Sequence, residues 1–379
     1  MSKTNTVTIA PTATFGMKLL AREAAAKPGE NIMISPLSVA VALAMAANGA
    51  RGNTLAGITS TLGLGDVDQS ASNAAYAELL SELKRDKIGV TLAVANAIFA
   101  RQGVDFYESF LNANRDSFGA RVDVLDFDAA ETVDAINDWI GESTQQKITK
   151  LLEEIDPLTI MYLINCVYFK GEWTVKFDKD LTEDQPFTTA GGSAKDHPLM
   201  YRSADMVYGR GEAYTYISLP FGESKDVRLI AFLPQADKST ADVIAALSAD
   251  DAKQLTYAIA NTYESEGELW LPRFDLEYEN TLNDSLQALG MADAFSSATA
   301  DFGALRPTPP AVYISEVKHK TVFKVDEEGA EGAAATSVGF GLESVSFPFE
   351  IRFDRPFVTV VADSKTNAIL FAGVVNDPK

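Results

Sequence analysis

The chain has 379 residues, and its 46% hydrophobic content is enough for a core that needs no disulfide or metal cross-links. Its 53 acidic residues outnumber 32 basic ones, which gives a formal net charge of −21. Such a surface repels nucleic-acid phosphates, anionic lipid headgroups and heparin-like polyanions. We therefore expect no nucleic acid, no membrane and no heparin-like polyanion among its partners. The one short basic cluster is Lys84-Arg85 with Lys87.

Cysteine and histidine are too scarce for most metal sites. The single cysteine, Cys166, excludes an internal disulfide framework and is expected to be a small buried apolar residue. With only two histidines, His197 and His319, a His-rich metal site is nearly excluded as well. No phosphate-binding loop, dinucleotide-binding glycine motif, HExxH motif or GxSxG motif occurs. We therefore expect no cofactor, no metal and no catalytic residues, since an enzyme would need an unrecognised acidic active site.

No apolar run approaches the length of a membrane-spanning helix, because the longest covers residues 39–47. The first twenty residues also lack the apolar stretch of a signal peptide. We therefore expect a soluble protein of the cytoplasm, or a secreted protein whose leader has been removed.

Helical patterns dominate the first 150 residues. Apolar stripes predict helices around residues 15–20, 36–47, 76–83 and 133–140. The second of these is the best bounded: Ser35 can cap its free N–H groups, Pro36 suits its first turn, and Asn48-Gly49 ends it.

Strand patterns take over afterwards. The run 158–169 is almost entirely apolar, as in a central strand covered on both faces. In residues 317–325, apolar positions alternate with Lys318, Lys320 and Lys324, so this strand has one face in water. Together with further strand patterns at 90–99, 228–233, 268–272, 357–361 and 368–372, these features predict a single mixed α+β domain built on a large sheet.

Residues 326–347 fit neither pattern. From Gly329 to Ser337 no side chain is bulky and only Glu331 is charged. An exposed linker between two strands would account for this composition. The alternation favours a segment that can be buried as a strand, because one face carries no charge and becomes more apolar along its length. That face comprises Ala330, Gly332, Ala334, Thr336, Val338 and Phe340.

Several blocks, in order from the first helix to the C-terminus, resemble the serpin family of serine protease inhibitors. They include NIMISPLS at 31–38, LINCVYFKGEW at 163–173, LPRF at 271–274 and LGMADAF at 289–295. Residues 43–45, 49–54, 319–329, 352–357 and 371–376 match further blocks. Each block alone is weak evidence, but their common order over the whole chain is specific.

The resemblance implies an α+β, single-domain serpin fold over residues 1–379, with helices packed on three β-sheets and an exposed reactive-centre loop at about 327–349. It implies a suicide inhibitor and not an enzyme. The target serine protease cleaves the loop and forms an acyl-enzyme, and the cut loop then inserts into the large sheet and distorts the protease.

The driving force is a stored conformational free energy. A strand of about ten residues gains ladder hydrogen bonds of about 1 kcal/mol each. The total, on the order of 10 kcal/mol, is comparable with the stability of a whole domain. The native form is then kinetically stable, and we expect a monomer with a risk of loop–sheet polymerisation.

Non-inhibitory relatives typically carry bulky, charged or proline residues where the loop enters the sheet. Small residues fill that hinge here, although Ala330 stands where Thr or Ser is usual and Gly332 where Ala is usual. Inhibition is therefore favoured, and a non-inhibitory serpin acting as carrier, chaperone or protease substrate is the alternative. The hinge residues implied by the resemblance are Glu327, Glu328, Gly329, Ala330, Glu331, Gly332, Ala333, Ala334, Ala335 and Thr336.

The family's spacing, counted from Glu327, places the reactive bond between Glu343 and Ser344. Counting back from Arg355 instead places it about two residues later, at residues 345–346. We prefer the first position because insertion geometry fixes the hinge side of the loop.

A glutamate at the reactive bond favours a glutamate-preferring protease with a basic specificity pocket, since an unpaired carboxylate is costly to bury elsewhere. A chymotrypsin-like or elastase-like enzyme is the second choice, because Phe340, Leu342 and Val345 lie near Glu343 in the sequence.

Four residues match the family's shutter, the hydrogen-bonded region that parts as the loop enters. One of them, His319, is also expected to be a satisfied core histidine on the apolar face of its strand. Trp173 matches the breach, near the expected point of loop entry, and is also expected to pack in the core. The shutter residues are Ser35, Ser38, Asn165 and His319.

Overall fold

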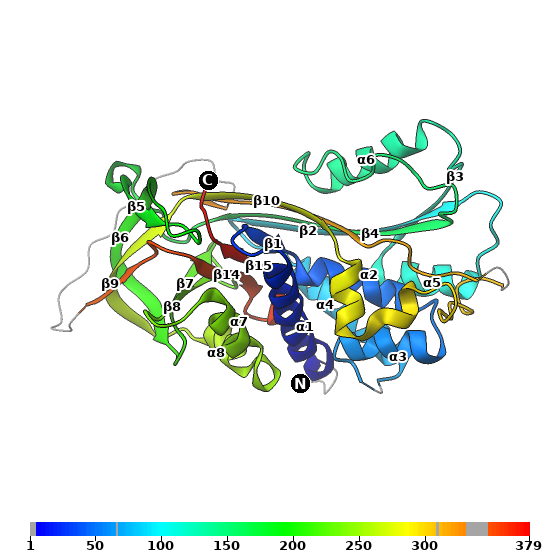
Figure 1. Ribbon diagram of the computed structural model, residues 1–379, viewed down its shortest axis with the longest axis horizontal. Helices are drawn as coiled ribbons and strands as arrows, with labels where there is room; N and C mark the ends of the chain where they lie inside the picture. Colours follow the sequence, from blue (N-terminus) through cyan, green and yellow to red (C-terminus); the bar gives the residue numbers. More distant parts are fainter. Residues whose placement is uncertain (1–4, 66, 308–310, 331–347) are drawn as a thin grey trace.

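Most of the helices lie in the first 150 residues and most of the strands lie after them, as the sequence patterns predict. The computed structural model describes residues 5–65, 67–307, 311–330 and 348–379. Its helices are α1 (Asn5–Ala26), α2 (Pro36–Ala47), α3 (Gly52–Thr61), α4 (Gln69–Leu83), α5 (Glu108–Phe118), α6 (Thr132–Ser143), α7 (Thr240–Ser248), α8 (Lys253–Ala260) and α9 (Asn283–Leu286). Figure 1 shows α6 above the long strands and the other labelled helices below them.

The largest sheet among the described residues has nine strands, all antiparallel to their neighbours except one terminal pair. They are β1 (Ile32–Ile34), β5 (Glu183–Thr188), β6 (Ala194–Arg210), β7 (Tyr214–Phe221), β8 (Val227–Pro234), β9 (Glu264–Pro272), β13 (Phe349–Arg352), β14 (Phe357–Asp363) and β15 (Ala368–Val375). The spatial order is β1-β15-β14-β8-β7-β6-β9-β13, and β5 pairs with β6.

Two smaller sheets carry the strands that matter for the site. In one, β12 (Gly329–Ala330), β4 (Met161–Glu172), β2 (Val90–Arg101) and β3 (Arg121–Leu125) pair in that order. In the other, β10 (Phe274–Thr281) pairs with β11 (Lys318–Val325) over the full length of both strands. The mixed α+β architecture expected from the sequence is therefore confirmed.

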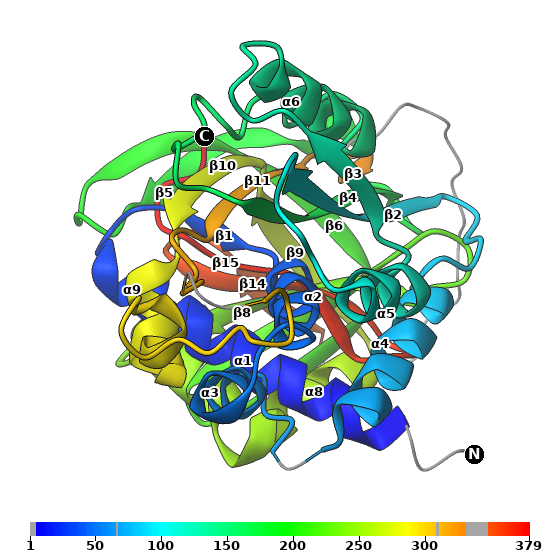
Figure 2. The ribbon, with the colours of Figure 1, turned by 90° about the vertical axis from the view of Figure 1, so that its right-hand side faces the viewer.

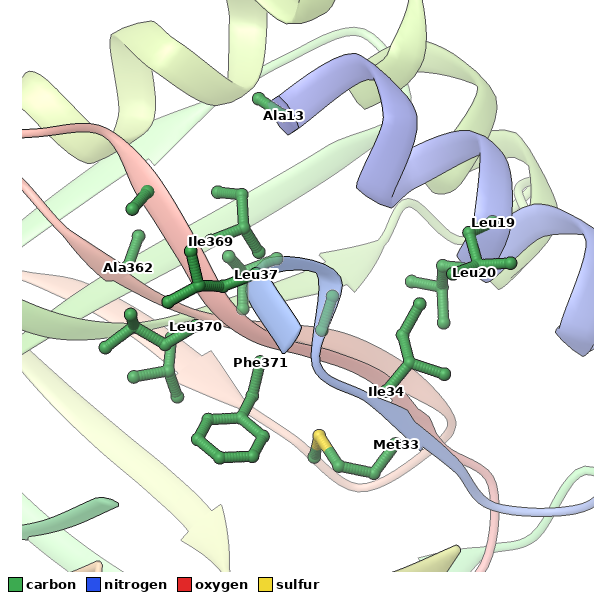
Figure 3. Packing of buried hydrophobic residues seen from close by; sticks show 14 of the residues in the cluster. Ala13, Leu19, Leu20, Met33, Ile34, Leu37, Ala362, Ile369, Leu370 and Phe371 are labelled. Carbon is green, nitrogen blue, oxygen red and sulfur yellow. The ribbon is translucent and has the colours of Figure 1, made fainter. Parts of the chain in front are cut away.

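The core joins the N-terminal helices to the C-terminal strands. In Figure 3, Leu19 and Leu20 of α1 lie on one side of the cluster, and Ile369, Leu370 and Phe371 of β15 lie on the other. All five side chains are at most 3% exposed. Full burial of such a side chain contributes about 1.5–3 kcal/mol. The two ends of the chain are therefore held by the same apolar cluster.

Helix α2 begins where the sequence predicts. The Ser35 hydroxyl accepts a hydrogen bond from the Ser38 N–H (3.3 Å), and Pro36 occupies the first turn. Every residue of the helix except Ala42 is buried. The helix packs against both β4 and β15. A helix that is covered on all sides has no polar face, which is why this segment is the longest apolar run in the sequence.

The structure differs from the sequence prediction at the start of β4. The apolar run predicts a strand from residue 158, but β4 begins at Met161. The Thr159 N–H donates to the Asp156 carbonyl (2.8 Å), and this turn leaves Leu158 83% exposed. Local turn formation therefore outweighs the apolar character of residues 158–160.

Candidate functional site

A cavity of about 1000 Å³ lies between β4 and β11. Residues 161–167 of β4 and 318–321 of β11 form its side walls, α2 lies on its core side, and Ile148 and Leu152 after α6 line the opposite side. Figure 2 shows this layering, with α6 on one side of the strands and α2 on the other. We call the space between the facing edges of β4 and β11 the slot.

Two strand edges border the slot. One edge of β4 pairs with β2 from Met161 to Gly171. On the other edge, pairing within the described residues is limited to Gly171 and Glu172, which face β12. β11 pairs with β10, and no strand of the described part of the chain pairs with its second edge. Unpaired peptide groups away from water cost free energy, so the slot can accept a strand that pairs on both sides.

The first two residues of such a strand are already in place. In β12, Gly329 lies opposite Glu172 and Ala330 lies opposite Gly171, in antiparallel register. Reciprocal hydrogen bonds between Asp326 and Gly329 (3.0 and 3.3 Å) turn the chain back from β11. Gly329 has a φ of 149°, and a Cβ there would lie 2.0 Å from the Gly171 carbonyl oxygen, so the turn requires glycine. The Ala330 side chain is buried, as the alternation in the sequence predicts.

A buried carboxylate anchors the hinge just before this turn. Oε1 of Glu327 accepts hydrogen bonds from Nε of Arg273 (2.7 Å) and from the Thr182 hydroxyl (2.5 Å). Burial alone would raise the pKa of Glu327, but the hydrogen bonds from Arg273 and Thr182 outweigh it and lower that pKa below its usual value. The charged carboxylate therefore ties the hinge to the junction between β9 and β10, where Arg273 lies.

The next residue, Glu328, is anchored by two lysines. Its carboxylate lies 2.9 Å from Nζ of Lys176 and 2.8 Å from Nζ of Lys179. Hydrogen bonds from Lys176 and Lys179 lower the pKa of Glu328. Both lysines follow β4 in the chain, so Glu328 ties the hinge to the β4 side of the slot.

Trp173 lies directly after β4 and contacts the same turn. Its indole N–H donates to the Asp326 carbonyl (2.8 Å), and its backbone N–H donates to the Glu328 carbonyl (2.9 Å). The indole stacks on the Phe221 ring, with centroids 4.3 Å apart and planes 12° apart. The residue assigned to the breach by resemblance therefore combines core packing with two bonds to the hinge.

The four residues assigned to the shutter meet at the start of α2. The Ser35 N–H donates to Nε2 of His319 (3.0 Å), and the Ser38 hydroxyl donates to the Asn165 carbonyl (3.2 Å). The Asn165 amide in turn donates to Oδ1 of Asn96 on β2 (2.6 Å). One helix start therefore bridges β11 on one side of the slot and β4 on the other.

Two polar side chains of the shutter, His319 and Asn165, are described by their protonation and hydrogen bonding. Burial lowers the pKa of His319 to about 4, so its ring is neutral at neutral pH. Because Nε2 accepts from Ser35, the ring proton lies on Nδ1. Oδ1 of Asn165 is buried without a hydrogen-bond partner among the described residues. A buried acceptor without a donor costs about 1–3 kcal/mol.

Part of the predicted site lies outside the described residues. The hinge residues that the structure places are Glu327, Glu328, Gly329 and Ala330. The predicted site residues beyond the described ranges are Glu331, Gly332, Ala333, Ala334, Ala335, Thr336, Glu343 and Ser344.

Sequence reasoning missed the partners of the hinge glutamates. Arg273 offered a signal, since it lies within the LPRF block, but nothing in that block pairs it with Glu327. Lys176 and Lys179 follow Trp173 closely, yet ordinary surface lysines have the same spacing. These partners become visible only when the fold brings distant residues into contact, because Arg273 lies 54 positions from Glu327 and the two lysines lie about 150 positions from Glu328.

The other candidates have structural roles. Nε2 of His197 lies 2.6 Å from the Arg273 carbonyl, and burial lowers the pKa of His197. Cys166 is buried, as expected of a small core residue, and burial raises its pKa to about 12. Within the described ranges, no group of three or more His, Cys, Asp or Glu could hold a metal ion. None of the described helices combines the length and apolarity of a bilayer span.

Comparison with known proteins agrees with this geometry. The family model for serpin (serine protease inhibitor) matches residues 10–378. Serpin B6 of Pongo abelii is 33% identical over 383 residues, which cover 96% of this chain and 98% of that protein. The thermophilic serpin tengpin in the native state is 32% identical with a TM-score of 0.87, over 97% of this chain and 94% of tengpin.

A further similar structure is thyroxine-binding globulin in complex with thyroxine. It is 26% identical with a TM-score of 0.85, over 98% of this chain and 99% of the globulin. The family match over nearly the whole chain, together with the fold, shows that this chain belongs to the serpins, a family of serine protease inhibitors and not of enzymes.

Proposed function

We propose that this chain irreversibly inhibits serine endopeptidases by inserting its cleaved reactive-centre loop into the slot. The observation that carries the proposal is the slot itself. Its walls, β4 and β11, stand apart around a cavity of about 1000 Å³, while β12 already pairs with β4 at one end. The resting protein thus has room for one more strand and holds the first two residues of that strand.

The register of β12 predicts where each loop residue would lie after insertion. Because the pairing is antiparallel, each residue after Ala330 moves one position back along β4, so residue 340 would lie opposite Met161. The ten residues 331–340 would therefore fill β4. A loop cut after Glu343 would keep residues 341–343 as a short tether to the protease. At about 3.3 Å per residue, the acylated end would lie about 40 Å from Ala330.

The same register assigns the faces of the inserted strand. Since the Ala330 side chain is buried, even-numbered residues would point toward the core. Those nearest the entry, Gly332, Ala334 and Thr336, are small, so they fit beneath the sheet without displacing its aromatic core.

The proposed partner is a serine protease that cleaves after glutamate, because Glu343 would occupy its specificity pocket. A chymotrypsin-like or elastase-like protease remains the second choice, with cleavage at a neighbouring bond. The sequence of the loop, and not the slot, decides which of these proteases is inhibited, since insertion needs only the small residues of the hinge.

Inhibition without a heparin-like activator is also part of the proposal. Lys87, from the one short basic cluster, is buried and forms an ion pair with Asp363 (3.5 Å), so it is not available to a polyanion. Arg85 pairs with Glu82 (2.8 Å). The net charge of −21 further opposes polyanion binding.

The proposal is tested by incubating the chain with a glutamyl endopeptidase, a chymotrypsin-like protease and an elastase-like protease. We expect a detergent-resistant complex on denaturing gels, with intact mass showing a cut after Glu343. A Glu343→Ala variant should lose inhibition of the glutamyl endopeptidase. A complex with another protease of the panel would keep the mechanism and move the bond.

Cleavage by every protease without a complex would contradict the inhibitory function. That outcome would favour a carrier, chaperone or substrate role. The likeness to a thyroxine-bound globulin makes this the relevant alternative. The unfolding midpoint of the cleaved protein in guanidinium separates the inhibitory function from this alternative, because insertion of the loop should raise that midpoint strongly.

A further inference from the structure

Three carboxylates are buried in the described part of the chain, and one of them has no cation beside it. Glu327 faces Arg273, and Asp363 faces Lys87 at 3.5 Å. Glu23 of α1 is only 1% exposed, yet it belongs to none of the ion pairs among the described residues. A buried charge without compensation is costly, so this carboxylate depends on its hydrogen bonds.

Three donors from β10 and α9 converge on Glu23. Its Oε2 atom accepts from the Tyr278 hydroxyl (2.5 Å) and from the Asn280 amide (2.6 Å), both on β10. Its Oε1 atom accepts from the Ser285 hydroxyl of α9 (2.5 Å). Lys27, one turn further along α1, lies over the Tyr278 ring with Nζ 4.9 Å from the centroid. Since hydrogen bonds to a charged acceptor are about twice as strong as neutral ones, these contacts hold β10 firmly on α1. We call Glu23, Tyr278, Asn280 and Ser285 the Glu23 cluster.

The Glu23 cluster acts on one wall of the slot through strand pairing. On β11, His319 lies opposite Asn280 and Thr321 lies opposite Tyr278. His319 accepts from the start of α2, as described above, and the Thr321 hydroxyl donates to the Met33 carbonyl of β1 (2.6 Å). The wall formed by β10 and β11 is therefore attached to α1, β1 and α2 in succession.

The hydrogen bond that joins α2 to the other wall is of a weaker kind. It runs from the Ser38 hydroxyl to the Asn165 carbonyl of β4, is 3.2 Å long and involves no charge. The charged contacts of Glu23 therefore hold the β11 side of the slot more firmly than this bond holds the β4 side.

We propose that Glu23 is a positioning residue for loop insertion, because its carboxylate keeps the β10–β11 wall in place while a strand enters beside β11. The inference rests on the proposed function, since it assumes that the loop inserts. A strand that enters must align with the peptide groups of β11, so that edge has to keep its position. Helix α1 can serve as the anchor because it packs against α2, α7 and β15, and its Leu19 and Leu20 are fully buried.

The direction of the bonds explains why a carboxylate stands at this buried position. An apolar side chain would also pack between α1 and β10, but apolar contacts have no preferred direction. Hydrogen bonds to both oxygens of Glu23 fix where β10 and α9 lie along the helix.

The first test measures the Glu23 cluster in the resting protein, without any protease. Hydrogen exchange of the β10 and β11 amides is compared with that of the β7 and β8 amides in the same molecule. The matched control is Glu279→Gln, which removes a carboxylate from the exposed face of β10, where Glu279 pairs with Lys320 (2.8 Å). We expect Glu23→Leu to raise exchange in β10 and β11 about tenfold, Tyr278→Phe to raise it less, and Glu279→Gln to leave it unchanged.

The second test measures insertion with a protease that the unmodified chain inhibits. A combined variant, Glu23→Leu with Tyr278→Phe and Ser285→Ala, makes most of the cluster apolar and should regain most of the stability that Glu23→Leu alone loses. We still expect its share of cleaved, uncomplexed inhibitor to be about threefold higher than that of the unmodified chain. Recovery of the complex together with stability would show a merely structural role and overturn the positioning role.

The two tests separate this inference from the proposed function. No complex with the unmodified chain and any protease would refute the proposed function, and the positioning role with it. A normal complex with the unmodified chain, together with equal exchange in Glu23→Leu and Glu279→Gln, would leave the function intact and refute the role of Glu23 alone.

Discussion

The backbone N–H of Ser35 donates a hydrogen bond to Nε2 of His319, which lies 284 positions later in the chain (3.0 Å). The bond joins the start of α2 to the wall of the slot formed by β11. It exists only while Nε2 is unprotonated, because a protonated nitrogen would face another donor. The protonation state of one imidazole is therefore coupled to the contact between α2 and β11.

We predict that acid destabilises the resting form through His319. Burial lowers the pKa of this residue to about 4, and nearby Glu23 opposes that shift without cancelling it. The ordinary pKa of His is about 6.5, so between these pH values the unfolded chain binds more protons than the folded one. The stabilisation is complete above pH 6.5 and is lost as the pH falls toward 4, with a total of about 3 kcal/mol.

The measurement is the urea dependence of unfolding from pH 4.5 to 8, for the unmodified chain and for His319→Gln. The variant should be less stable at pH 7.5, and the difference between the two proteins should shrink toward pH 4.5. Parallel pH profiles would show that His319 does not carry the effect.

A second prediction concerns Oδ1 of Asn165, the buried acceptor described above. The register places residue 336, a threonine, opposite Asn165 on β4 and opposite His319 on β11. A hydroxyl there could donate to Oδ1 of Asn165, which is buried and unpartnered among the described residues. We expect Thr336→Val, which keeps the volume, to reduce the stability of the loop-cleaved form by about 1–3 kcal/mol.

The readout for this variant is the unfolding midpoint of the cleaved protein in guanidinium. Thr336→Ser retains the hydroxyl and should behave like the unmodified chain. If Val and Ser give the same midpoint, the hydroxyl does not reach Asn165.

Much of the fold can be predicted from the sequence because its signals are local. Ser35 and Pro36 mark the start of α2 by capping chemistry, and the lysine alternation marks β11. The strand prediction at 158–160 is wrong because an Asp156 turn, also a local feature, was not weighed against apolar character. The sequence patterns identified neither α3 nor α5, although the buried residues Phe110, Leu111, Asn114 and Phe118 of α5 lie on one face of that helix.

The site was harder to predict, because its geometry depends on contacts between distant segments. The resemblance named the residues that meet around the slot, among them Asn165 and His319, but not the cavity between β4 and β11. The cations that hold Glu327 and Glu328 could not be predicted either, since an ion pair has no sequence period. What the alternation did predict is the inward face of Ala330, because side-chain direction in a strand follows from position alone.

A third prediction concerns the buried anchor of the hinge. Glu327→Gln keeps the shape of the side chain but removes the charge that Arg273 and Thr182 stabilise. We expect the resting form to lose about 1–2 kcal/mol and to form polymers or an inactive inserted form faster on warming. Native gels and residual inhibition after incubation at 45 °C would measure both.

Glu328→Gln is the matched control for this prediction. The side chain of Glu328 is 12% exposed and that of Glu327 is 3% exposed, so the change at Glu328 should have the smaller effect. Equal acceleration by both variants, or none by Glu327→Gln, would contradict the role of the buried Glu327 carboxylate.

The last prediction tests the faces of the inserted strand with one side chain at two adjacent positions. The register places Gly332 opposite Phe169 and Phe323, whose rings stack in the core with centroids 6.4 Å apart. We expect Gly332→Gln to push a polar side chain into this stack, to stall insertion and to turn the chain into a substrate. Glu331→Gln introduces the same residue on the outer face, so it should still yield the complex.

Denaturing gels of both variants with an inhibited protease separate these outcomes. Gly332→Gln should give cleaved inhibitor and free protease, whereas Glu331→Gln should give mainly the complex. Gly332→Ala, which adds a single methyl group beside the rings, should retain most inhibition. The reverse order of the two glutamine variants would mean that the strand enters one residue out of register, because a shift of one position exchanges the two faces.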